Sequence, residues 1–379
     1  MIGIKIADNY IMRLIIILIC IFFFTTLFSW EFRRPLNFSR SFLSAPSVLG
    51  KIYKIGGLEV DNEICNIVEE YDPIRDTWIL KRPMLRKKCD MGCVVVENKI
   101  YIFGGITEVH QGRWKVVNDL DVYDPINNTW VRKRGLPFSR TGTRGVRVGN
   151  YIYIFGGIDS LYHYLDEVLV YDIERDTWLF YCRMPRPLAR PGVGYYDSFI
   201  HIIGGEFYSP LSFHYRLNLR NQRWETLPPL PFPRSGFLTT FENGKIYIIG
   251  GETRYQNRRV YYKRVDVYDC LNNSWYLLDS INIARSYGDA GILSYNSNNF
   301  LYVVGGNTSS GITGSLEVHQ LSGIKEEKKK NIKEKENYQI LGIYNLLGKK
   351  VDKEKNKGIY FYLVKDNKSY KIKKRIVIK

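Results

Sequence analysis

The sequence predicts an all-β fold, a six-bladed β-propeller closed by an N-terminal strand. Six Gly-Gly pairs recur along the 379 residues, each at the end of a short apolar run. They are Gly56-Gly57, Gly104-Gly105, Gly156-Gly157, Gly204-Gly205, Gly250-Gly251 and Gly305-Gly306. Their spacings of 48, 52, 48, 46 and 55 residues give a period near 50, which is typical of a radial β-repeat.

A tryptophan stands between successive glycine pairs. These residues are Trp78, Trp130, Trp178, Trp224 and Trp275. The distance from the tryptophan to the next pair is 26 residues four times and 30 once, whereas the other half of the period varies more. A constant half indicates packed strands, and a variable half indicates a surface loop.

Each unit is expected to hold four strands, as the fifth unit illustrates. Alternating apolar residues there predict strands over 236–242, 245–249, 264–268 and 274–278, with a turn at 269–273. The glycine pairs suit places where a strand end approaches its neighbours closely or takes a positive φ.

The two ends of the repeat region predict how the ring closes. The sixth unit has a third strand over 315–321, but no tryptophan follows it. Trp30 lies 26 residues before Gly56, and residues 30–40 parallel residues 130–140. We therefore expect Trp30 to open the outer strand of the sixth blade, which would leave no exposed sheet edges at the closure.

The repeated motif resembles the kelch repeat: Gly-Gly, then Val-Tyr-Asp-Pro, then Thr-Trp. The best copies are residues 122–130 and 171–178, followed by 71–78 and 268–275, while the fourth unit has Leu217-Asn218 in place of Tyr-Asp. The resemblance covers about three quarters of the chain and implies a kelch-type propeller over residues 30–321.

Charge and cysteines exclude several classes of partner. The net charge is +17, but residues 322–379 carry +11 of it and the other 321 residues only +6, so a nucleic-acid partner is not expected. Six cysteines show neither a disulfide framework nor zinc spacing, and buried apolar packing is the expected role. No metal and no cofactor are predicted.

The N-terminal and C-terminal segments both resemble targeting signals. Lys5 and Arg13 precede the apolar run 14–29, which predicts a signal peptide over 1–29, touching a membrane only transiently; a retained anchor is the alternative. A charged linker is expected at 322–337, with a Lys/Glu run over 325–336, and a small β domain at 338–379 with strands over 340–351, 358–364 and 370–379.

The C-terminal segment resembles the type A sorting domain of proteins exported by the type IX secretion system. Residues 343–349, residues 358–362 and Lys373-Lys374 carry the resemblance, whereas the charged run and Asp366-Asn367-Lys368 depart from it. It implies export to the outer cell surface or secretion, with the secretion machinery as a partner. An appendage without a transport role is the alternative.

The position ten residues after each tryptophan is basic in five of six units. It holds Arg40, Lys88, Arg140, Leu188, Arg234 and Arg285, with Arg190 two residues further on in the fourth unit. Sixfold symmetry predicts a ring at the channel mouth that could bind a carboxylate or sulfate. Alternatively, these side chains belong to the kelch pattern and bond the backbone of neighbouring blades.

Long aromatic loops are expected on the same face. They contribute Trp114, Tyr162, Tyr208 and Tyr255, which suit sugar stacking or a protein hot spot, although solvated loops would also contain them. His110 and His163 could bind a metal only with Glu108 or Asp159, which is not favoured. His201, His214 and His319 fall on predicted strands.

The sequence contains no Ser-His-Asp signature and no phosphate-cradling glycine loop. It is similar to sialic-acid mutarotases, six-bladed kelch proteins that need an acid or base beside arginine, and Glu206 and Glu252 are weak candidates for that role. The prediction is a secreted or cell-surface binding module for a saccharide or protein ligand. The alternatives are an enzyme acting on acidic sugars and a structural spacer of the cell envelope.

Overall fold

The computed structural model describes residues 29–110, 113–256, 258–321, 339–345, 350–351, 358–365 and 370–377. The chain divides into two compact units, Met1–Gly323 and Ile324–Lys379, each taken here by itself. The expected signal peptide, except Ser29, and the charged linker lie outside the described residues. Among the described residues, no helix is long and apolar enough to cross a membrane.

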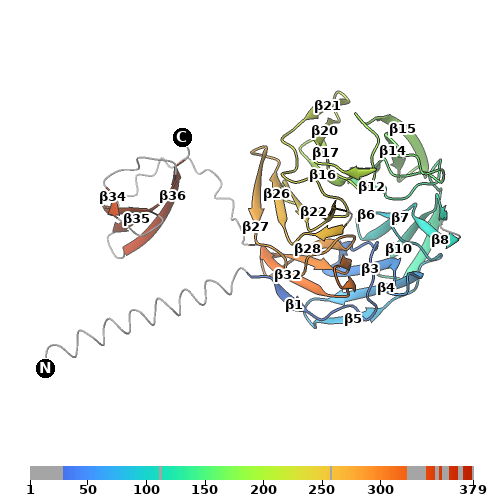
Figure 1. Ribbon diagram of the computed structural model, residues 1–379, viewed down its shortest axis with the longest axis horizontal. Coiled ribbons are helices and arrows are strands. Elements are labelled where there is room, and N and C mark those ends of the chain that lie inside the picture. Colours follow the sequence, from blue (N-terminus) through green and yellow to red (C-terminus); the bar gives the residue numbers. More distant parts are fainter. Residues whose placement is uncertain are drawn as a thin grey trace. The chain divides into compact units, whose positions relative to one another are not determined.

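The first unit is a six-bladed propeller, which confirms the predicted all-β fold (Figure 1). Six four-stranded antiparallel sheets surround a central axis. The innermost strands are β2 (Ser47–Val48), β6 (Gly92–Val96), β12 (Arg144–Val148), β16 (Gly192–Tyr196), β22 (Leu238–Glu242) and β28 (Asp289–Tyr295). The second strands are β3 (Lys51–Leu58), β7 (Lys99–Phe103), β13 (Tyr151–Phe155), β17 (Phe199–Ile203), β23 (Lys245–Ile249) and β29 (Asn298–Val304).

The outer half of each blade contains the tyrosine and tryptophan motifs. The third strands are β4 (Ile64–Asp72), β10 (Leu120–Asp124), β14 (Glu167–Asp172), β20 (His214–Asn218), β26 (Val265–Asp269) and β32 (Leu316–Leu321). The fourth strands are β5 (Thr77–Leu80), β11 (Thr129–Lys133), β15 (Thr177–Arg183), β21 (Arg223–Thr226), β27 (Ser274–Leu278) and β1 (Glu31–Arg33). Apolar residues between adjacent blades form the core.

The N-terminal strand closes the ring as predicted. β1 pairs antiparallel with β32, with Glu31 opposite Val318. Trp30 immediately precedes the strand, is buried, and stacks on His319 with ring centroids 5.1 Å apart. The outer strand of the last blade therefore comes from the beginning of the chain.

Each repeated tryptophan joins its blade to the preceding one. The indole N–H donates a hydrogen bond of 2.8–3.0 Å to a backbone carbonyl there. The acceptors are Arg34, Arg82, Arg134, Arg183, Pro228 and Asp279, for Trp78, Trp130, Trp178, Trp224, Trp275 and Trp30 in turn. Because Trp30 bonds to Asp279 in the fifth blade, the series runs around the whole ring.

The glycine pairs occur where neighbouring blades meet. In the third blade both glycines have positive φ, and a Cβ on Gly156 would lie 2.2 Å from the carbonyl oxygen of Leu188 in the fourth blade. The N–H of Gly157 donates to that same carbonyl at 2.9 Å. Both predicted reasons for glycine, close approach and positive φ, are therefore confirmed at this position.

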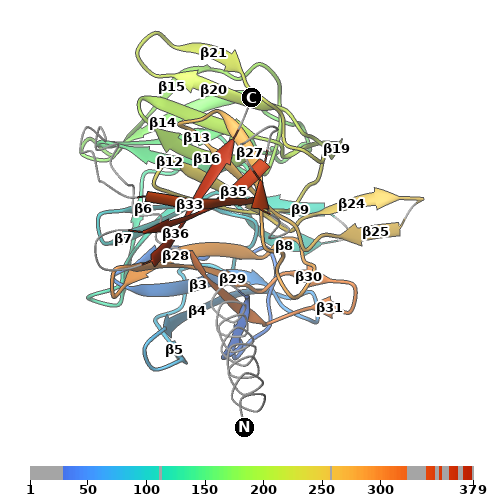
Figure 2. The same ribbon diagram turned by 90° about the vertical axis from the view of Figure 1, so that its left-hand side faces the viewer.

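Hairpins between second and third strands project from one face, the loop face (Figure 2). They are β8–β9 (Ile106–His110, Arg113–Val116), β18–β19 (Glu206–Phe207, Ser209–Pro210), β24–β25 (Glu252–Tyr255, Arg258–Tyr261) and β30–β31 (Asn307–Thr308, Gly311–Ile312). Loops from each fourth strand to the next innermost strand cross the same face. The face thus combines long loops with a rigid scaffold beneath them.

The second unit contains β33 (Gln339–Asn345), β34 (Lys350–Val351), β35 (Gly358–Lys365) and β36 (Tyr370–Val377), in the order β34-β33-β35-β36. The segment 340–351, expected as one strand, contains two, because β34 pairs with the end of β33. The motif residues 346–349 and 366–368 lie outside the described residues. These strands do not identify the unit as a sorting domain.

Candidate functional site

The basic residues predicted to ring the channel are buried. Arg40, Lys88, Arg140, Arg234 and Arg285 all have no exposed surface. In the fifth blade, Arg234 Nε donates to the carbonyl of Gly250 at 2.7 Å, and Nη2 donates to Asp266 Oδ2 at 2.7 Å. The Arg234 guanidinium thus joins a glycine pair to the third strand of its blade.

The same pairing recurs in four other blades. The ion pairs are Arg40–Glu69 at 2.5 Å, Lys88–Asp121 at 2.7 Å, Arg140–Glu167 at 3.0 Å and Arg285–Glu317. The donors expected at the channel mouth are therefore not exposed at these five positions, since each side chain is buried and paired with a carboxylate of its blade; Arg140 Nε, which has no partner among the described residues, is buried as well. The geometry matches the alternative interpretation, in which these residues bond the backbone, except that they bond within their own blade.

The fourth blade lacks both the basic residue and the acidic residue of this ion pair. Leu188 occupies the basic position and is fully buried. The residue opposite Ile202 on the third strand is Tyr215, where the fifth blade has Asp266 opposite Ile248. Both partners are missing together. An acidic residue two positions before the Tyr-Asp motif was the sequence signal for three of these pairs, those of Glu69, Asp121 and Asp266, whereas Glu167 lies four positions before it.

Two residues after each of these positions lies a second ring, here called the floor ring. Its members are Phe42, Asp90, Gly142, Arg190, Gly236 and Tyr287, and all have left-handed φ between 51° and 63°. Backbone N–H groups donate to the next member at 2.6–3.0 Å in five of the six links: Phe42 to Tyr287, Tyr287 to Gly236, Arg190 to Gly142, Gly142 to Asp90 and Asp90 to Phe42. Positive φ in four non-glycine residues marks a strained backbone at a candidate functional position.

The floor ring also explains one wrong strand boundary. The first strand of the fifth blade was expected to begin at Gly236, but β22 begins at Leu238. Gly236 has φ +60° and its carbonyl accepts from Tyr287 instead of joining a strand ladder.

A cavity of about 570 Å³, the cup, lies on the loop-face side of the floor ring. The ring members Phe42, Asp90, Arg190 and Tyr287 line it. Its walls come from the hairpins and loops, and include Trp114, Tyr164, Glu206, Tyr208, Glu252, Arg254 and Arg259. This size lies within the range of ordinary ligand pockets.

Arg190 organises the charges at the bottom of the cup. Its Nε and Nη2 donate to the two carboxylate oxygens of Asp90, at 3.1 and 2.6 Å, and Nη1 donates to Glu206. Burial favours the neutral form, but Asp90 and Glu206 outweigh it and raise the pKa of Arg190. Burial followed by Glu206 also raises the pKa of Tyr287. Of the seven residues named for the predicted basic ring, Arg190 is the one that lines the cup.

Glu252 lies on the other wall. Its Oε2 accepts from the Ser286 hydroxyl at 2.7 Å, and its Oε1 is 3.8 Å from Arg259 Nε. The Arg259 side chain is half exposed. Both weak candidates for an acid or base, Glu206 and Glu252, therefore line the same cavity beside arginine.

The four predicted aromatic residues divide into two pairs. Trp114 and Tyr208 line the cup. Tyr162 accepts a hydrogen bond from the backbone N–H of Trp114 at 3.0 Å, which ties the second blade to the third. Tyr255 lies near the tip of β24–β25 and is 66% exposed, outside the cup lining.

The histidines are dispersed. His201 and His214 are buried and 2.9 Å apart, Nδ1 to Nε2, and His319 packs on Trp30. His163 is exposed beside Asp159, while the side chain of His110 lies outside the described part. Within the described residues, no group of three histidine, cysteine or acidic side chains could bind a metal ion. The five described cysteines are free.

Fold and site together define a kelch-type β-propeller, an architecture that typically serves protein interaction. Residues 52–313 match the family model described as the Attractin/LZTR1 beta-propeller, and the chain belongs to that family.

Similar proteins include Kelch-like protein terF of Aspergillus terreus, 28% identical over 60% of this chain and 52% of that protein. Kelch-like protein 25 of Xenopus tropicalis is 25% identical over 64% and 41%, respectively. The chain thus matches about half or less of each relative's length. The solved structure of YjhT aligns with a TM-score of 0.63 at 17% identity, covering 76% of this chain and 99% of that one, which shows the fold alone.

Proposed function

We propose that this propeller binds a protein ligand through its loop face, with the cup as the centre of the interface. The observation that carries the proposal is the cluster of exposed apolar side chains around the cup. Tyr208 is 77% exposed on β18–β19, and Leu161, Tyr255 and Val60 are 66–70% exposed on neighbouring loops. Large aromatic residues of this kind provide hot spots in protein interfaces.

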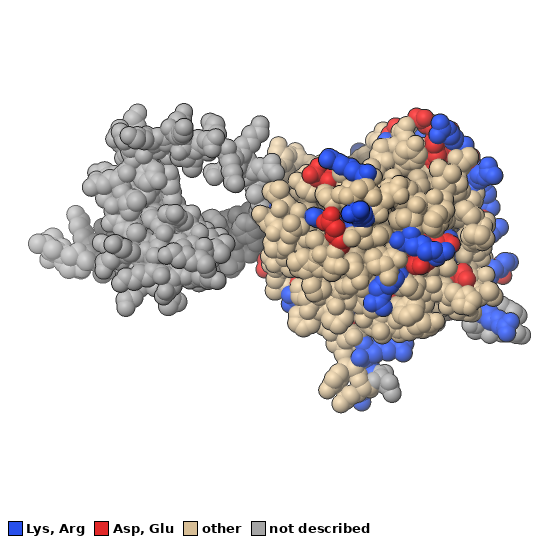
Figure 3. Space-filling model, turned by 90° about the horizontal axis from the view of Figure 1, so that it is seen from above, with Lys and Arg blue, Asp and Glu red and all other residues tan. Residues whose placement is uncertain are grey.

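The charge distribution supports a polar protein partner. Arginine and carboxylate side chains alternate in the cup, so its lining has no single sign. Figure 3 shows basic and acidic side chains interspersed on the face that it draws. A polyanion needs an extended basic surface, whereas mixed charge suits a rim that selects its partner by complementarity.

The test compares two double variants of the full chain. Tyr208→Ala/Tyr255→Ala removes exposed side chains from the loop face, and Leu179→Ala/Phe180→Ala removes two exposed apolar side chains from the outer strand β15. We expect the first to lose proteins that the unaltered chain captures by cross-linking from its source cells, and the second to retain them. Equal capture by both variants would contradict a loop-face interface.

A second candidate is saccharide binding, extending to a mutarotase-like enzyme that acts on acidic sugars. The specific observation is that Glu206, Glu252 and Arg190 line a cavity of about 570 Å³ together with Trp114 and Tyr208. Aromatic rings can stack on a sugar, and a carboxylate could move a proton.

Thermal-shift measurements with neutral, acidic and sulfated sugars distinguish this candidate. Stabilisation by an acidic sugar that Arg259→Ala abolishes would place the ligand in the cup and justify an assay for anomer interconversion. No shift with any sugar would remove the saccharide candidate. If protein capture also failed, a structural spacer of the envelope would remain.

We also infer export of the protein to the outer surface or medium. The apolar segment 14–29 and the resemblance of 338–379 to a type IX sorting domain support this. We expect deletion of 338–379 to leave the propeller inside the envelope, as measured by fractionation. Unchanged localisation after that deletion would identify the C-terminal unit as an appendage without a transport role.

A further inference from the structure

A second cavity lies on the far side of the floor ring from the cup. It encloses about 350 Å³ between the innermost strands and is here called the axial well. Five residues that directly follow ring members line it, namely Leu43, Met91, Pro191, Phe237 and Gly288, whereas four ring members line the cup. The floor ring therefore separates the two cavities, and the axial well has its own chemistry.

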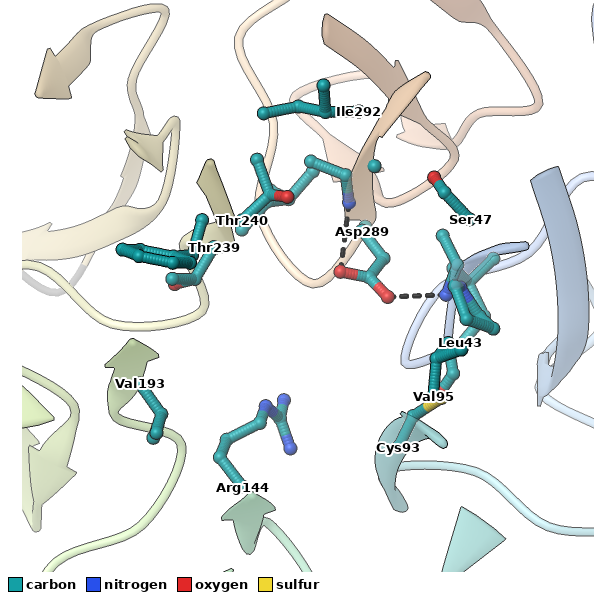
Figure 4. A pocket seen from close by; sticks show the side chains of 18 of the residues that line it. Leu43, Ser47, Cys93, Val95, Arg144, Val193, Thr239, Thr240, Asp289 and Ile292 are labelled. Atoms are coloured by element: carbon teal, nitrogen blue, oxygen red, sulfur yellow. Dashed lines mark hydrogen bonds between the residues drawn. The ribbon is translucent and has the colours of Figure 1, made fainter. Parts of the chain in front are cut away.

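Arg144 provides unused hydrogen-bond donors in the axial well. It begins β12 and its side chain points into the cavity (Figure 4). Nη1 donates to the carbonyl of Thr143 at 2.9 Å, and Nη2 is 3.9 Å from Asp90. Both carboxylate oxygens of Asp90 already accept from Arg190. The remaining N–H groups of Arg144 have no acceptor among the described residues.

Asp289 lines the well at the start of β28. Its carboxylate accepts backbone N–H groups from Ala45 and Ala290. Lys54 is fully buried, its Nζ has no hydrogen-bond partner among the described residues, and Asp289 is the acidic group that attracts it most. The Asp289 carboxylate is thus already met by two backbone donors, whereas Arg144 still has N–H groups without an acceptor among the described residues.

Hydroxyl groups complete the lining. Ser47, Thr239 and Thr240 line the well, and none of their hydroxyls has a hydrogen-bond partner among the described residues (Figure 4). Glu242 also lines it, but ends β22 four residues beyond Leu238, about 13 Å away along the strand. Glu242 therefore lies toward the other end of β22 from the floor ring, whereas Arg144 lies two residues after the ring member Gly142.

We propose that the axial well binds a small oxyanion, a carboxylate, phosphate or sulfate, through Arg144 and the surrounding hydroxyls. A guanidinium with free N–H groups binds such planar or tetrahedral oxygen groups through paired, charge-assisted hydrogen bonds. This site is separate from the cup and goes beyond the proposed protein binding.

Calorimetric titration of the full chain with acetate, inorganic phosphate and sulfate, at constant ionic strength set with chloride, tests the proposal. We expect saturable binding of at least one of the three. Arg144→Gln should weaken that binding roughly tenfold or more, because it removes a charge-assisted pair. Arg144→Lys retains the positive charge but loses the paired N–H groups of the guanidinium, and the variant protein should bind the anion with intermediate affinity.

Two control variants locate the ion. Arg175→Gln removes an exposed cation from the outer turn of the same blade and should leave the affinity unchanged. Arg259→Gln removes a cation from the cup, and selective loss of binding in this variant would place the ion there and overturn the proposal. Absence of saturable binding by all three anions would overturn it as well, as would equal affinity of Arg144→Gln and the unaltered chain.

Discussion

At the scale of residues, a repeated set of charged side chains forms ion pairs inside the blades. Arg234 and Asp266 are both buried, and removing Arg234 leaves Asp266 with only the partly exposed Arg264 as a cation. We expect Arg234→Leu to lower the free energy of unfolding by about 3–5 kcal/mol, as measured by urea denaturation. Exposed Arg175→Leu should change it by less than about 1 kcal/mol.

The fourth blade supplies a control for that prediction. It lacks both partners of the pair, with Leu188 in the basic position. Replacing both residues of the fifth blade, as Arg234→Leu/Asp266→Leu, should therefore recover part of the stability lost in the single variant. If the double variant had the same free energy of unfolding as Arg234→Leu, the prediction would be wrong, because Asp266 without Arg234 would then not destabilise the fold.

The buried histidine pair predicts a pH dependence. Burial, followed by Arg216, lowers the pKa of His201 to about 4, and burial, followed by His201, lowers the pKa of His214. Both are neutral in the fold, so the unfolded chain binds more protons below pH 6.5. The stabilisation is complete above pH 6.5 and is lost as the pH falls toward 4, by about 3 kcal/mol for His201 alone.

A substitution isolates this contribution from the titration of carboxylates. Five other blades have tyrosine at the position of His201: Tyr53, Tyr101, Tyr153, Tyr247 and Tyr302. We expect His201→Tyr to reduce the loss of stability between pH 7 and pH 4.5, measured by denaturant unfolding. An identical pH profile in both proteins would contradict the assignment.

At the scale of elements, the glycine pairs set the distance between blades. Gly156→Ala would place a methyl group against the carbonyl of Leu188, in addition to the cost of its positive φ. Gly149 has nearly the same φ, +58°, but nothing within 4 Å of its Cβ position. We expect Gly149→Ala to cost about 1 kcal/mol and Gly156→Ala clearly more, by thermal or urea unfolding. An equal loss of unfolding free energy in the two variants would show that the interface between the blades can move to accommodate the methyl group.

At the scale of the whole molecule, stability depends on joining the two ends of the propeller. Trp30 is buried, stacks on His319 and donates to Asp279, whereas Phe32 two residues later is 57% exposed. We expect Trp30→Ala to lower the free energy of unfolding by about 3–5 kcal/mol and to expose the sixth blade to proteolysis. Phe32→Ala should behave like the unaltered chain, within about 0.5 kcal/mol.

Much of the architecture could be predicted from the sequence because its cause is local and repeated. Gly-Gly, Tyr-Asp and Thr-Trp recur in phase, so blade number, strand order and the closing role of residues 30–33 follow from spacing. Even the aromatic residues of the cup, Trp114 and Tyr208, could be assigned to the loop face, since each lies between a second and a third strand.

Only the tertiary structure decided which charged groups are free. Arg40 meets Glu69 29 residues further along, and Arg190 meets Asp90 100 residues away in another blade. The same residue type, at positions two apart in the repeat, is therefore either buried in a blade or placed at the bottom of the cup. The repeat alone determined the propeller, while pairing and burial across blades, which depend on distant side chains, determined the floor ring, the cup and the axial well.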